Sequence, residues 1–286
     1  MTNEAAASRI SERLVAAGDG WRAVDIVCRA GPGDPAFEER HERTSVAVVL
    51  DGSFAYRSGG GRALMSPGSL LLGNRDTCFA CGHDHGRGDR CVAFQFEPAF
   101  VEAAAADLHG VRRAEFPQHR LPPLEALSPL VAGARVLAAG TADADEAEEL
   151  SASLLAAALG GALDAAPPPV TLRDEARVAA ALARIGAGDG DGLRLADLAA
   201  AAGVGRHHFL RIFRAVVGTT PHRYVLARRL AAAAAALRTD GGTVLDIALS
   251  AGFSDLSEFT RRFRARFGVP PAAYRRRHRR ADRTTT

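Results

Sequence analysis

The segment CFACGHDHGRGDRC, residues 78–91, concentrates side chains that bind soft metals or react with oxidants. It holds three of the four cysteines of the chain and two histidines. We expect the fourth, Cys28, to be a core residue, with a role as a distant partner left open. A Cys-x-x-Cys spacing lets two sulfurs reach one ion, and His-x-His places two imidazoles on one side of an extended segment. The candidate ligands for zinc or another soft metal ion are Cys78, Cys81, His83, His85 and Cys91.

Two other interpretations of this segment stay open. Arg87, Arg90 and the histidines would favour a reactive thiolate at Cys78. Cys81 or Cys91 would then resolve the oxidised sulfur. Alternatively, the segment is a polar hairpin whose cysteines act as small hydrophobic residues. No second Cys-x-x-Cys follows, so the spacing is not that of a standard zinc finger.

The charge of the chain is divided between its two halves. All 36 basic residues are Arg, and residues 171–286 hold 21 of them against 10 Asp and Glu, a net charge of +11. The first 170 residues carry 15 Arg and 23 acidic residues, a net charge of −8. A basic half joined to an acidic half favours a polyanionic partner, although a solvated basic face would give the same count.

The basic half contains an internal repeat of 49 to 50 residues. Each copy reads as a short Ala-rich helix, a tight turn at a glycine and a second helix, which is the sequence form of a helix-turn-helix. The repeated pairs are Leu198 and Ile247, Gly203 and Gly252, Phe209 and Phe259, Phe213 and Phe263, Gly218 and Gly268, and Tyr224 and Tyr274.

The second helix of each copy has an apolar stripe and a polar face. Apolar residues recur at i, i+3, i+4 and i+7 from Phe209 to Val216, and Phe259 and Phe263 follow the same rule. A helix in a major groove presents Arg to guanine edges and phosphates. We therefore predict these residues to contact DNA: His207, Leu210, Arg211, Arg214, Ser257, Glu258, Arg261 and Arg262. Glu258 also fits a capping box with Asp255, a purely structural role.

Residues 221–242 predict one Ala-rich helix between the two copies, ended by Gly241 and Gly242. About 18 residues at about 1.5 Å each span roughly 27 Å. Successive major-groove faces lie about 34 Å apart. A rigid helix of this length would hold two reading heads on adjacent turns of one DNA face.

Residues 185–279 resemble the DNA-binding domain of AraC-type transcription regulators. The matching positions are Leu198-Ala199, Phe213, Gly218, Pro221, Tyr224, Arg229-Leu230, Ala233, Ile247-Ala248, Gly252-Phe253-Ser254, Phe259, Phe263, Phe267-Gly268-Val269-Pro270 and Tyr274-Arg275. The resemblance implies double-stranded DNA as the partner and base-reading positions at His207, Leu210, Arg211, Ser257, Glu258 and Arg261. Gly205 replaces the usual Ser helix cap, and Gly caps almost as well.

Residues 45–58, 62–74 and 91–96 are short apolar runs separated by turn residues, typical of a small all-β barrel. Regulators of this type often carry a cupin barrel ahead of the DNA-binding domain, and this half resembles one. The resemblance places the cupin metal triad near Glu39, His41 and Cys78. Because the His triad is not intact, this departure argues against an oxygenase.

The whole chain is therefore predicted to be α+β: a cupin-like sensor domain over residues 1–120, a helical dimerisation segment over 121–166 and an AraC-type DNA-binding domain over 171–286. The Ala- and Leu-rich stretch 121–165 is expected to join two copies into a homodimer. No signal peptide and no membrane span is apparent, so we expect a cytoplasmic protein with no membrane partner.

These features predict a sequence-specific DNA-binding transcription regulator, not an enzyme, that responds to a metal, redox or small-molecule signal. The alternative is a cupin-type metal enzyme, or a cysteine-dependent DNA-repair protein, fused to a DNA-binding domain. The operator, the regulated genes, the effector and the sense of regulation leave no recognisable pattern in the sequence.

Overall fold

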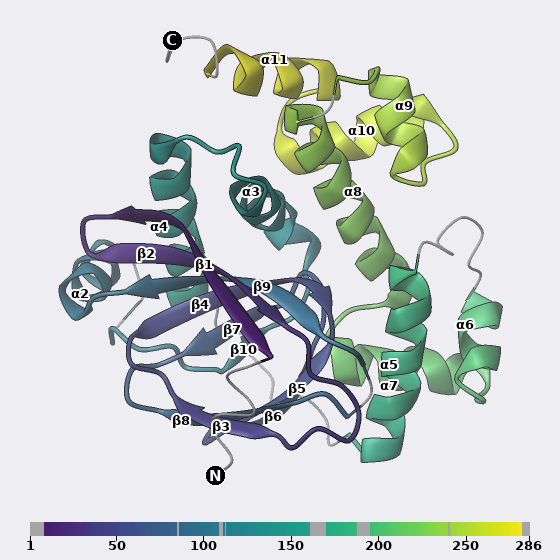
Figure 1. The fold of residues 1–286 in the computed structure, drawn as a ribbon. Helices are drawn as coiled ribbons and strands as arrows, with labels where there is room; N and C mark the ends of the chain where they lie inside the picture. The colour runs from purple at the N-terminus through teal and green to yellow at the C-terminus, as the bar shows by residue number, and fades with distance from the viewer. Residues whose placement is uncertain are drawn as a thin grey trace.

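The computed structural model describes residues 9–84, 86–108, 111, 113–160, 170–187, 195–239 and 241–281. Its first half is built from two facing β-sheets, with helices α3 and α4 on the outside of one of them (Figure 1). The C-terminal helices run along one side of this body, with α5–α7 at one end, α9–α11 at the other and α8 between them.

Both sheets are antiparallel throughout their described strands. The larger has the order β1 (Ile10–Gly18), β2 (Trp21–Cys28), β9 (Asp89–Phe96), β4 (Thr44–Gly52), β7 (Leu70–Gly73) and β10 (Arg120–Leu121). The smaller has the order β3 (Phe37–Arg40), β8 (Cys78–Gly82), β5 (Phe54–Ser58) and β6 (Gly61–Met65). The apolar run 45–58 is thus two strands, β4 and β5, whereas β1 and β2 were not predicted.

Strand β4 shows why the larger sheet needs a cover on each face. Val46, Val48 and Leu50 belong to a core that continues into α3 and α4, whereas Ala47 and Val49 belong to the core between the two sheets. Alternate residues of a strand point to opposite faces, so a continuous apolar run fits a strand that is buried on both.

The outer face of the larger sheet is covered by helices that follow β9. They are α2 (Pro98–Asp107), the short 3-10 helix η1 (Glu125–Leu127), α3 (Ser128–Ala138) and α4 (Ala144–Gly160). The buried residues of α4 include Leu154, Leu155 and Leu159, so its apolar face is used within the chain. The apolar faces expected to form a dimer interface in residues 121–160 are therefore largely occupied by intramolecular packing.

The C-terminal half forms the two predicted helix-turn-helix units. The first consists of α5 (Leu172–Gly186), α6 (Leu195–Ala201) and α7 (Arg206–Val217), and α8 (Pro221–Thr239) connects it to α9 (Val244–Ser250), α10 (Leu256–Phe267) and α11 (Pro271–Ala281). Helices α7 and α10 both end at a glycine with positive φ, 89° at Gly218 and 76° at Gly268. The predicted repeat and the α+β fold are confirmed.

Candidate nucleic-acid interface

Helix α7 turns its charged face away from the core of the first unit. Its apolar stripe from Phe209 to Val216 is buried, which leaves Arg211 and Arg214 exposed and Leu210 half-buried. Gly205 precedes the helix in extended conformation without a side-chain cap. His207 lies in the first turn, and its side chain is outside the described part of the structure.

Helix α10 presents the corresponding face of the second unit. The Asp255 carboxylate accepts hydrogen bonds from the backbone N–H groups of Ser257 and Glu258 at 2.9 and 3.3 Å, which fixes where the helix begins. The Glu258 carboxylate accepts from Nε of Arg262 at 2.8 Å, one turn along the helix. The predicted capping box is therefore only half formed. Of the four predicted contact residues on this helix, Ser257 and Arg261 are exposed, and Glu258 and Arg262 are half-buried.

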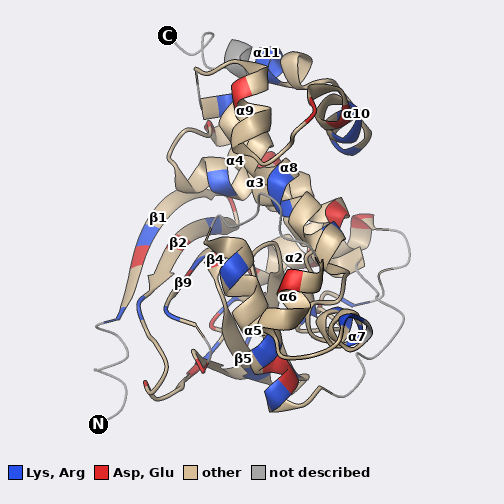
Figure 2. Cartoon of the chain, turned by 90° about the vertical axis from the view of Figure 1, so that its right-hand side faces the viewer, with Lys and Arg blue, Asp and Glu red and all other residues tan. Residues whose placement is uncertain are grey.

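An open hollow runs along the outer side of α10. Its lining residues are Leu256, Ser257, Thr260, Arg261, Arg264, Ala265 and Gly268. Arg-bearing turns lie on α10 and also on α7 (Figure 2). Both helices thus offer guanidinium donors toward solvent, the arrangement that suits phosphate and guanine contacts.

The first unit is bound to the barrel by two arginines. Nη2 and Nε of Arg62 in β6 donate to the Glu175 carboxylate of α5 at 2.6 and 2.9 Å. Nη1 of Arg120 donates to the carbonyl oxygens of Leu64 at 3.0 Å and Val216 at 2.7 Å. Burial lowers the pKa of Arg120 to about 10, because water is excluded from its guanidinium. The Arg62 contact holds α5, and the Arg120 contact holds the C-terminal end of α7, against the barrel.

The second unit is bound to the helical cover of the barrel. Glu146 of α4 pairs with Arg238 at the end of α8, and its Oε1 lies 3.1 Å from Nδ1 of His278 in α11. Arg266 of α10 donates to the carbonyl oxygen of Ala126 in η1. Both helix-turn-helix units therefore contact the N-terminal half.

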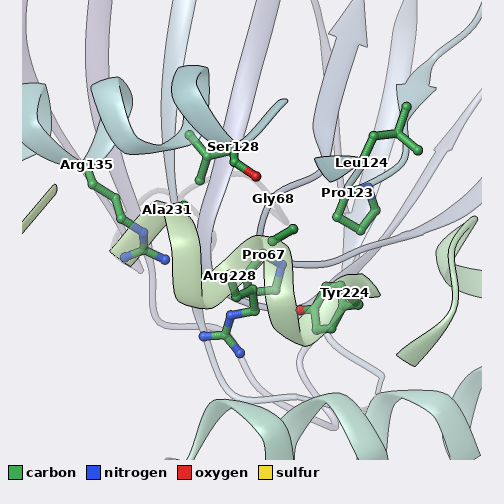
Figure 3. Close-up of a pocket in the computed structure, with 11 residues that line it drawn as sticks. Pro67, Gly68, Pro123, Leu124, Ser128, Arg135, Tyr224, Arg228 and Ala231 are labelled. Carbon is green, nitrogen blue, oxygen red and sulfur yellow. The ribbon is translucent and has the colours of Figure 1, made fainter. Parts of the chain in front are cut away.

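Helix α8 packs lengthwise on α3 and leaves little free space. A cavity of about 20 Å³ lies between α8, α3 and the turn at Gly68 (Figure 3). Arg135 and Arg228 line it together with Tyr224 and Ser128. A cavity of this size holds about one water molecule. The helix predicted to connect the two helix-turn-helix units thus also forms a tight contact between the two halves of the chain.

The cysteine-rich segment does not assemble as predicted. Cys78 is exposed, whereas Cys81 and Cys91 are buried in the core between the sheets. Cys78 and Cys81 are three positions apart in β8, and an odd separation places them on opposite faces of the strand. His83 is buried, and His85 lies outside the described residues. The structure thus separates Cys78 from Cys81, His83 and Cys91, the other predicted ligands that lie among the described residues.

Three side chains meet instead at a point that the sequence did not reveal. The ligand atoms of Cys28, His83 and Asp89 all lie within 4.8 Å of one another. Nε2 of His83 is 2.6 Å from Oδ1 of Asp89, and Sγ of Cys91 donates to Oδ2 of Asp89 at 3.3 Å. Burial opposes the charged imidazole, but the hydrogen bonds to Asp89 and Cys28 outweigh it and raise the pKa of His83 to about 9. Asp89 was missed because a lone Asp in a polar loop carries no signal.

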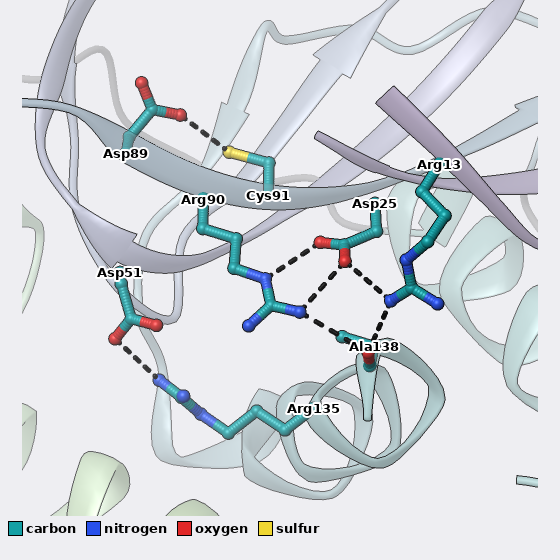
Figure 4. Close-up of polar contacts among 8 residues, drawn as sticks. All are labelled: Arg13, Asp25, Asp51, Asp89, Arg90, Cys91, Arg135 and Ala138. Atoms are coloured by element: carbon teal, nitrogen blue, oxygen red, sulfur yellow. Dashed lines mark hydrogen bonds and ion pairs between the residues drawn. The ribbon is translucent and has the colours of Figure 1, made fainter. Parts of the chain in front are cut away.

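Arg90, which was expected to favour a reactive thiolate, is paired with a carboxylate instead. Nε of Arg90 donates to the Asp25 carboxylate at 2.8 Å, on the other face of β9 from Cys91 (Figure 4). Burial, followed by the Asp89 carboxylate, raises the pKa of the Cys81 and Cys91 thiols well above the usual value. Protonated thiols are poor nucleophiles, so Cys81 and Cys91 are poorly suited to resolve an oxidised Cys78 as the redox interpretation requires.

The positions of the cupin triad are also not assembled. Arg40 lies opposite Cys78 and Glu39 opposite Phe79, so Cys78 shares a face with Arg40 and not with Glu39. His41 stacks on Phe79 with ring centroids 4.2 Å apart, and its Nε2 is 2.9 Å from the hydroxyl of Tyr56. Burial lowers the pKa of His41 to about 4, so the ring is neutral and structural.

Comparison with known proteins assigns both halves. Residues 27–163 match the family model of the AraC-like ligand binding domain, and residues 198–277 match a helix-turn-helix domain model. No helix among the described residues is both long and apolar enough to cross a membrane.

Two relatives and one solved structure are each similar to about a third of this chain. The transposon Tn10 TetD protein of Escherichia coli is 45% identical over 84 residues, 29% of this chain and 61% of TetD. The probable transcription factor PqrA of Proteus vulgaris is 39% identical over 85 residues, 30% of this chain and 70% of PqrA. An AraC-type regulator structure from Chromobacterium violaceum has 27% identity and a TM-score of 0.34, covering 38% of this chain and 96% of that one. The chain belongs to the AraC-type family of transcription regulators.

Proposed function

We propose that the chain is a sequence-specific regulator of transcription that binds double-stranded DNA through α7 and α10. The observation that carries this proposal is the pair of helix-turn-helix units whose second helices both expose Arg on the face opposite their buried stripe. The 19 residues of α8 span about 28 Å, close to the spacing of successive major-groove faces. The chain acts on DNA in the cytoplasm and catalyses no reaction.

The N-terminal half serves as the receiver of a signal in this proposal. Its match to an AraC-like ligand-binding domain supports that role, as do its direct contacts with both units through Glu175 and Glu146. A change of state in the barrel would act on α7 and α10 through these contacts. A small molecule, a metal ion and an oxidant are the candidate signals.

The test is selection of bound fragments from a random DNA pool with the full chain, repeated in the presence of candidate effectors. We expect enrichment of one motif with two elements about one helical turn apart. Recovery of fragments without a shared motif would contradict sequence-specific binding. A matched selection with a variant that lacks both Arg211 and Arg261 serves as the control.

We also propose that two copies associate through the N-terminal half, because paired half-sites raise affinity by effective concentration. The apolar faces of α3 and α4 pack within the chain, so the proposed dimer interface is the edge strand β1. This strand lies at the edge of the larger sheet, and its Leu14 is 62% exposed. Sedimentation of the full chain should give a dimer that Leu14→Arg dissociates. A monomer for the wild-type chain would contradict this.

A further inference from the structure

A cluster of metal-binding side-chain types lies outside the helix-turn-helix units, where β2 ends and β9 begins. Sulfur of Cys28, imidazole nitrogen of His83 and carboxylate oxygen of Asp89 lie within 4.8 Å of one another. Cys28 and His83 are 6% and 4% exposed, and the Asp89 side chain is 8% exposed. These are the donor types that proteins use for zinc.

Strand register explains why these residues meet although 61 positions separate the first from the last. Cys28 lies directly opposite Asp89, and Ile26 opposite Cys91, in the pairing of β2 with β9. Directly paired residues share a face, so Cys28, Asp89 and Cys91 all point into the space between the sheets. His83 follows the inward-facing Cys81 by two positions and enters that space from the smaller sheet.

Two glycines bring the loop before Asp89 close enough to Cys28. A Cβ at Gly88, whose φ is +67°, would lie 2.7 Å from the carbonyl oxygen of Cys28. A Cβ at Gly86 would lie 3.0 Å from the carbonyl oxygen of Ser53. Larger residues at either position would push the loop outward, so the glycines set the short distances in the cluster.

The cluster is satisfied as it stands. His83 and Asp89 form an ion pair, and the Cys91 thiol donates to the second oxygen of the same carboxylate. In a tetrahedral zinc site with bonds of about 2.0–2.1 Å, the nitrogen and the oxygen would be about 3.3 Å apart. A bound ion therefore requires the 2.6 Å contact between His83 and Asp89 to open by about 0.7 Å. Binding of an ion would thus replace the hydrogen bonds that His83, Asp89 and Cys91 make with one another.

We propose that Cys28, His83 and Asp89 form an exchangeable site for a thiophilic divalent cation of the zinc type, with Cys91 as the fourth ligand. The Cys91 sulfur lies 3.3 Å from Asp89 but outside the group of atoms that are all within 4.8 Å of one another, so it would move inward when the ion binds. Two thiolates, one imidazole and one carboxylate supply four donors of the softness that such an ion prefers. Cys78, on the outer face of β8, takes no part. The site does not depend on DNA binding, and its test uses the protein alone.

The experiment is metal titration of the full chain after chelator treatment. We expect one equivalent of Zn²⁺ per chain, measured by competition with a chromophoric chelator. Co²⁺ should give a sulfur-to-cobalt charge-transfer band together with the absorption of a tetrahedral ion, and Zn²⁺ should abolish both. Zinc should also raise the melting temperature of the wild-type chain, since it binds the folded state.

Matched variants locate the site. Cys28→Ser and His83→Ala should each lower zinc affinity at least about 100-fold, beyond the effect typical of an outer-shell partner. Cys78→Ser, another Cys-to-Ser change in the same half, should leave affinity unchanged. The wild-type cobalt spectrum decides the matter even if a variant fails to fold. The proposal fails if wild-type protein binds no stoichiometric zinc at micromolar concentration, or if Cys78→Ser costs as much affinity as Cys28→Ser. It also fails if mild peroxide oxidises these thiols while no metal binds.

Discussion

At the scale of single residues, Arg211 and Arg261 occupy equivalent outward positions on α7 and α10, and both are exposed. Neither takes part in packing the helix-turn-helix core, so their replacement tests recognition without disturbing the fold. A bidentate Arg–guanine contact contributes about 1–3 kcal/mol of discrimination between bases.

We predict that Arg211→Ala and Arg261→Ala each weaken specific DNA binding by about 1–3 kcal/mol and relax the preference at one base pair. Binding titrations across single-base variants of the selected motif measure both effects. Arg75→Ala, an exposed Arg in the turn after β7, is the control and should leave the profile unchanged. Unaltered preference in both helix variants would remove these two assignments.

A separate prediction concerns His41 and how the stability of the protein depends on pH. The pKa of His41 is about 4 in the folded state because of burial, against 6.5 for an ordinary imidazole. The folded state therefore disfavours protonation, and stability falls as the pH drops from about 6.5 to about 4. The loss from this group is at most about 3 kcal/mol.

The measurement is the free energy of unfolding of wild type and His41→Phe between pH 7 and pH 4. Phenylalanine keeps a ring against Phe79 but cannot titrate. The variant is expected to lose some stability at pH 7, where the contacts with Tyr56 and Ser45 are missing, and to show a flatter pH dependence. Parallel curves for the two proteins would show that His41 does not titrate in this range.

At the scale of elements, the turns after α7 and α10 form a natural matched pair. Gly218 and Gly268 both end a helix with positive φ. A Cβ at Gly218 would lie 2.4 Å from the Cβ of Pro122 in the N-terminal half, whereas a Cβ at Gly268 meets nothing within 4 Å. The same substitution therefore probes backbone strain alone at one site and strain plus a contact between halves at the other.

We predict that Gly268→Ala lowers the free energy of unfolding by about 1–2 kcal/mol, the cost of left-handed backbone for a residue with a Cβ. Gly218→Ala should lower it by about a further 1–3 kcal/mol, because Pro122 must move. Denaturant titration of the two variants compares them directly. Equal losses would mean that the turn at Gly218 is not pressed against the barrel.

The helical half was the part most accessible from sequence. Helix periodicity and the repeat are local signals, and they located α7, α10 and their terminal glycines. The sheets depend on register between distant strands, which no local pattern specifies. Cys28 meets Asp89 only because β2 pairs with β9 in one alignment, and β2 itself was not predicted. Strand alternation was sufficient to separate Cys78 from Cys81, but the boundaries of β8 had to be known first.

At the scale of the whole molecule, the two halves share one hydrophobic core. The cluster that contains Val46 and Leu50 of the larger sheet continues through α3 to Leu230 of α8 and Phe263 of the second unit. The first unit has its own core but includes Leu64 of β6. This continuity implies that the barrel stabilises the helix-turn-helix half, and that the chain unfolds as one body.

The fluorescence of Trp21 can test whether the chain unfolds as one body. This residue is the single tryptophan of the chain, it lies in the barrel and it is 4% exposed, so its fluorescence reports on the N-terminal half. Far-UV circular dichroism is dominated by helices, most of which belong to the C-terminal half. We predict coincident denaturant transitions by the two probes, which is the test of two-state unfolding.

The ion pair between Arg62 and Glu175 provides the variant for this experiment. The Glu175 side chain is 7% exposed, so Arg62→Met leaves a buried carboxylate without its partner and should cost about 3 kcal/mol. Arg57→Met, on the neighbouring strand, removes only a 3.8 Å pair with the exposed Asp84 and should cost less than about 1 kcal/mol. Loss of the Arg62 contact loosens the first unit from the barrel, so the helical signal should then change at lower denaturant than Trp21 fluorescence. Separate transitions in the wild-type chain would instead show that the two halves are thermodynamically independent, and that a signal in the barrel needs another route to α7 and α10.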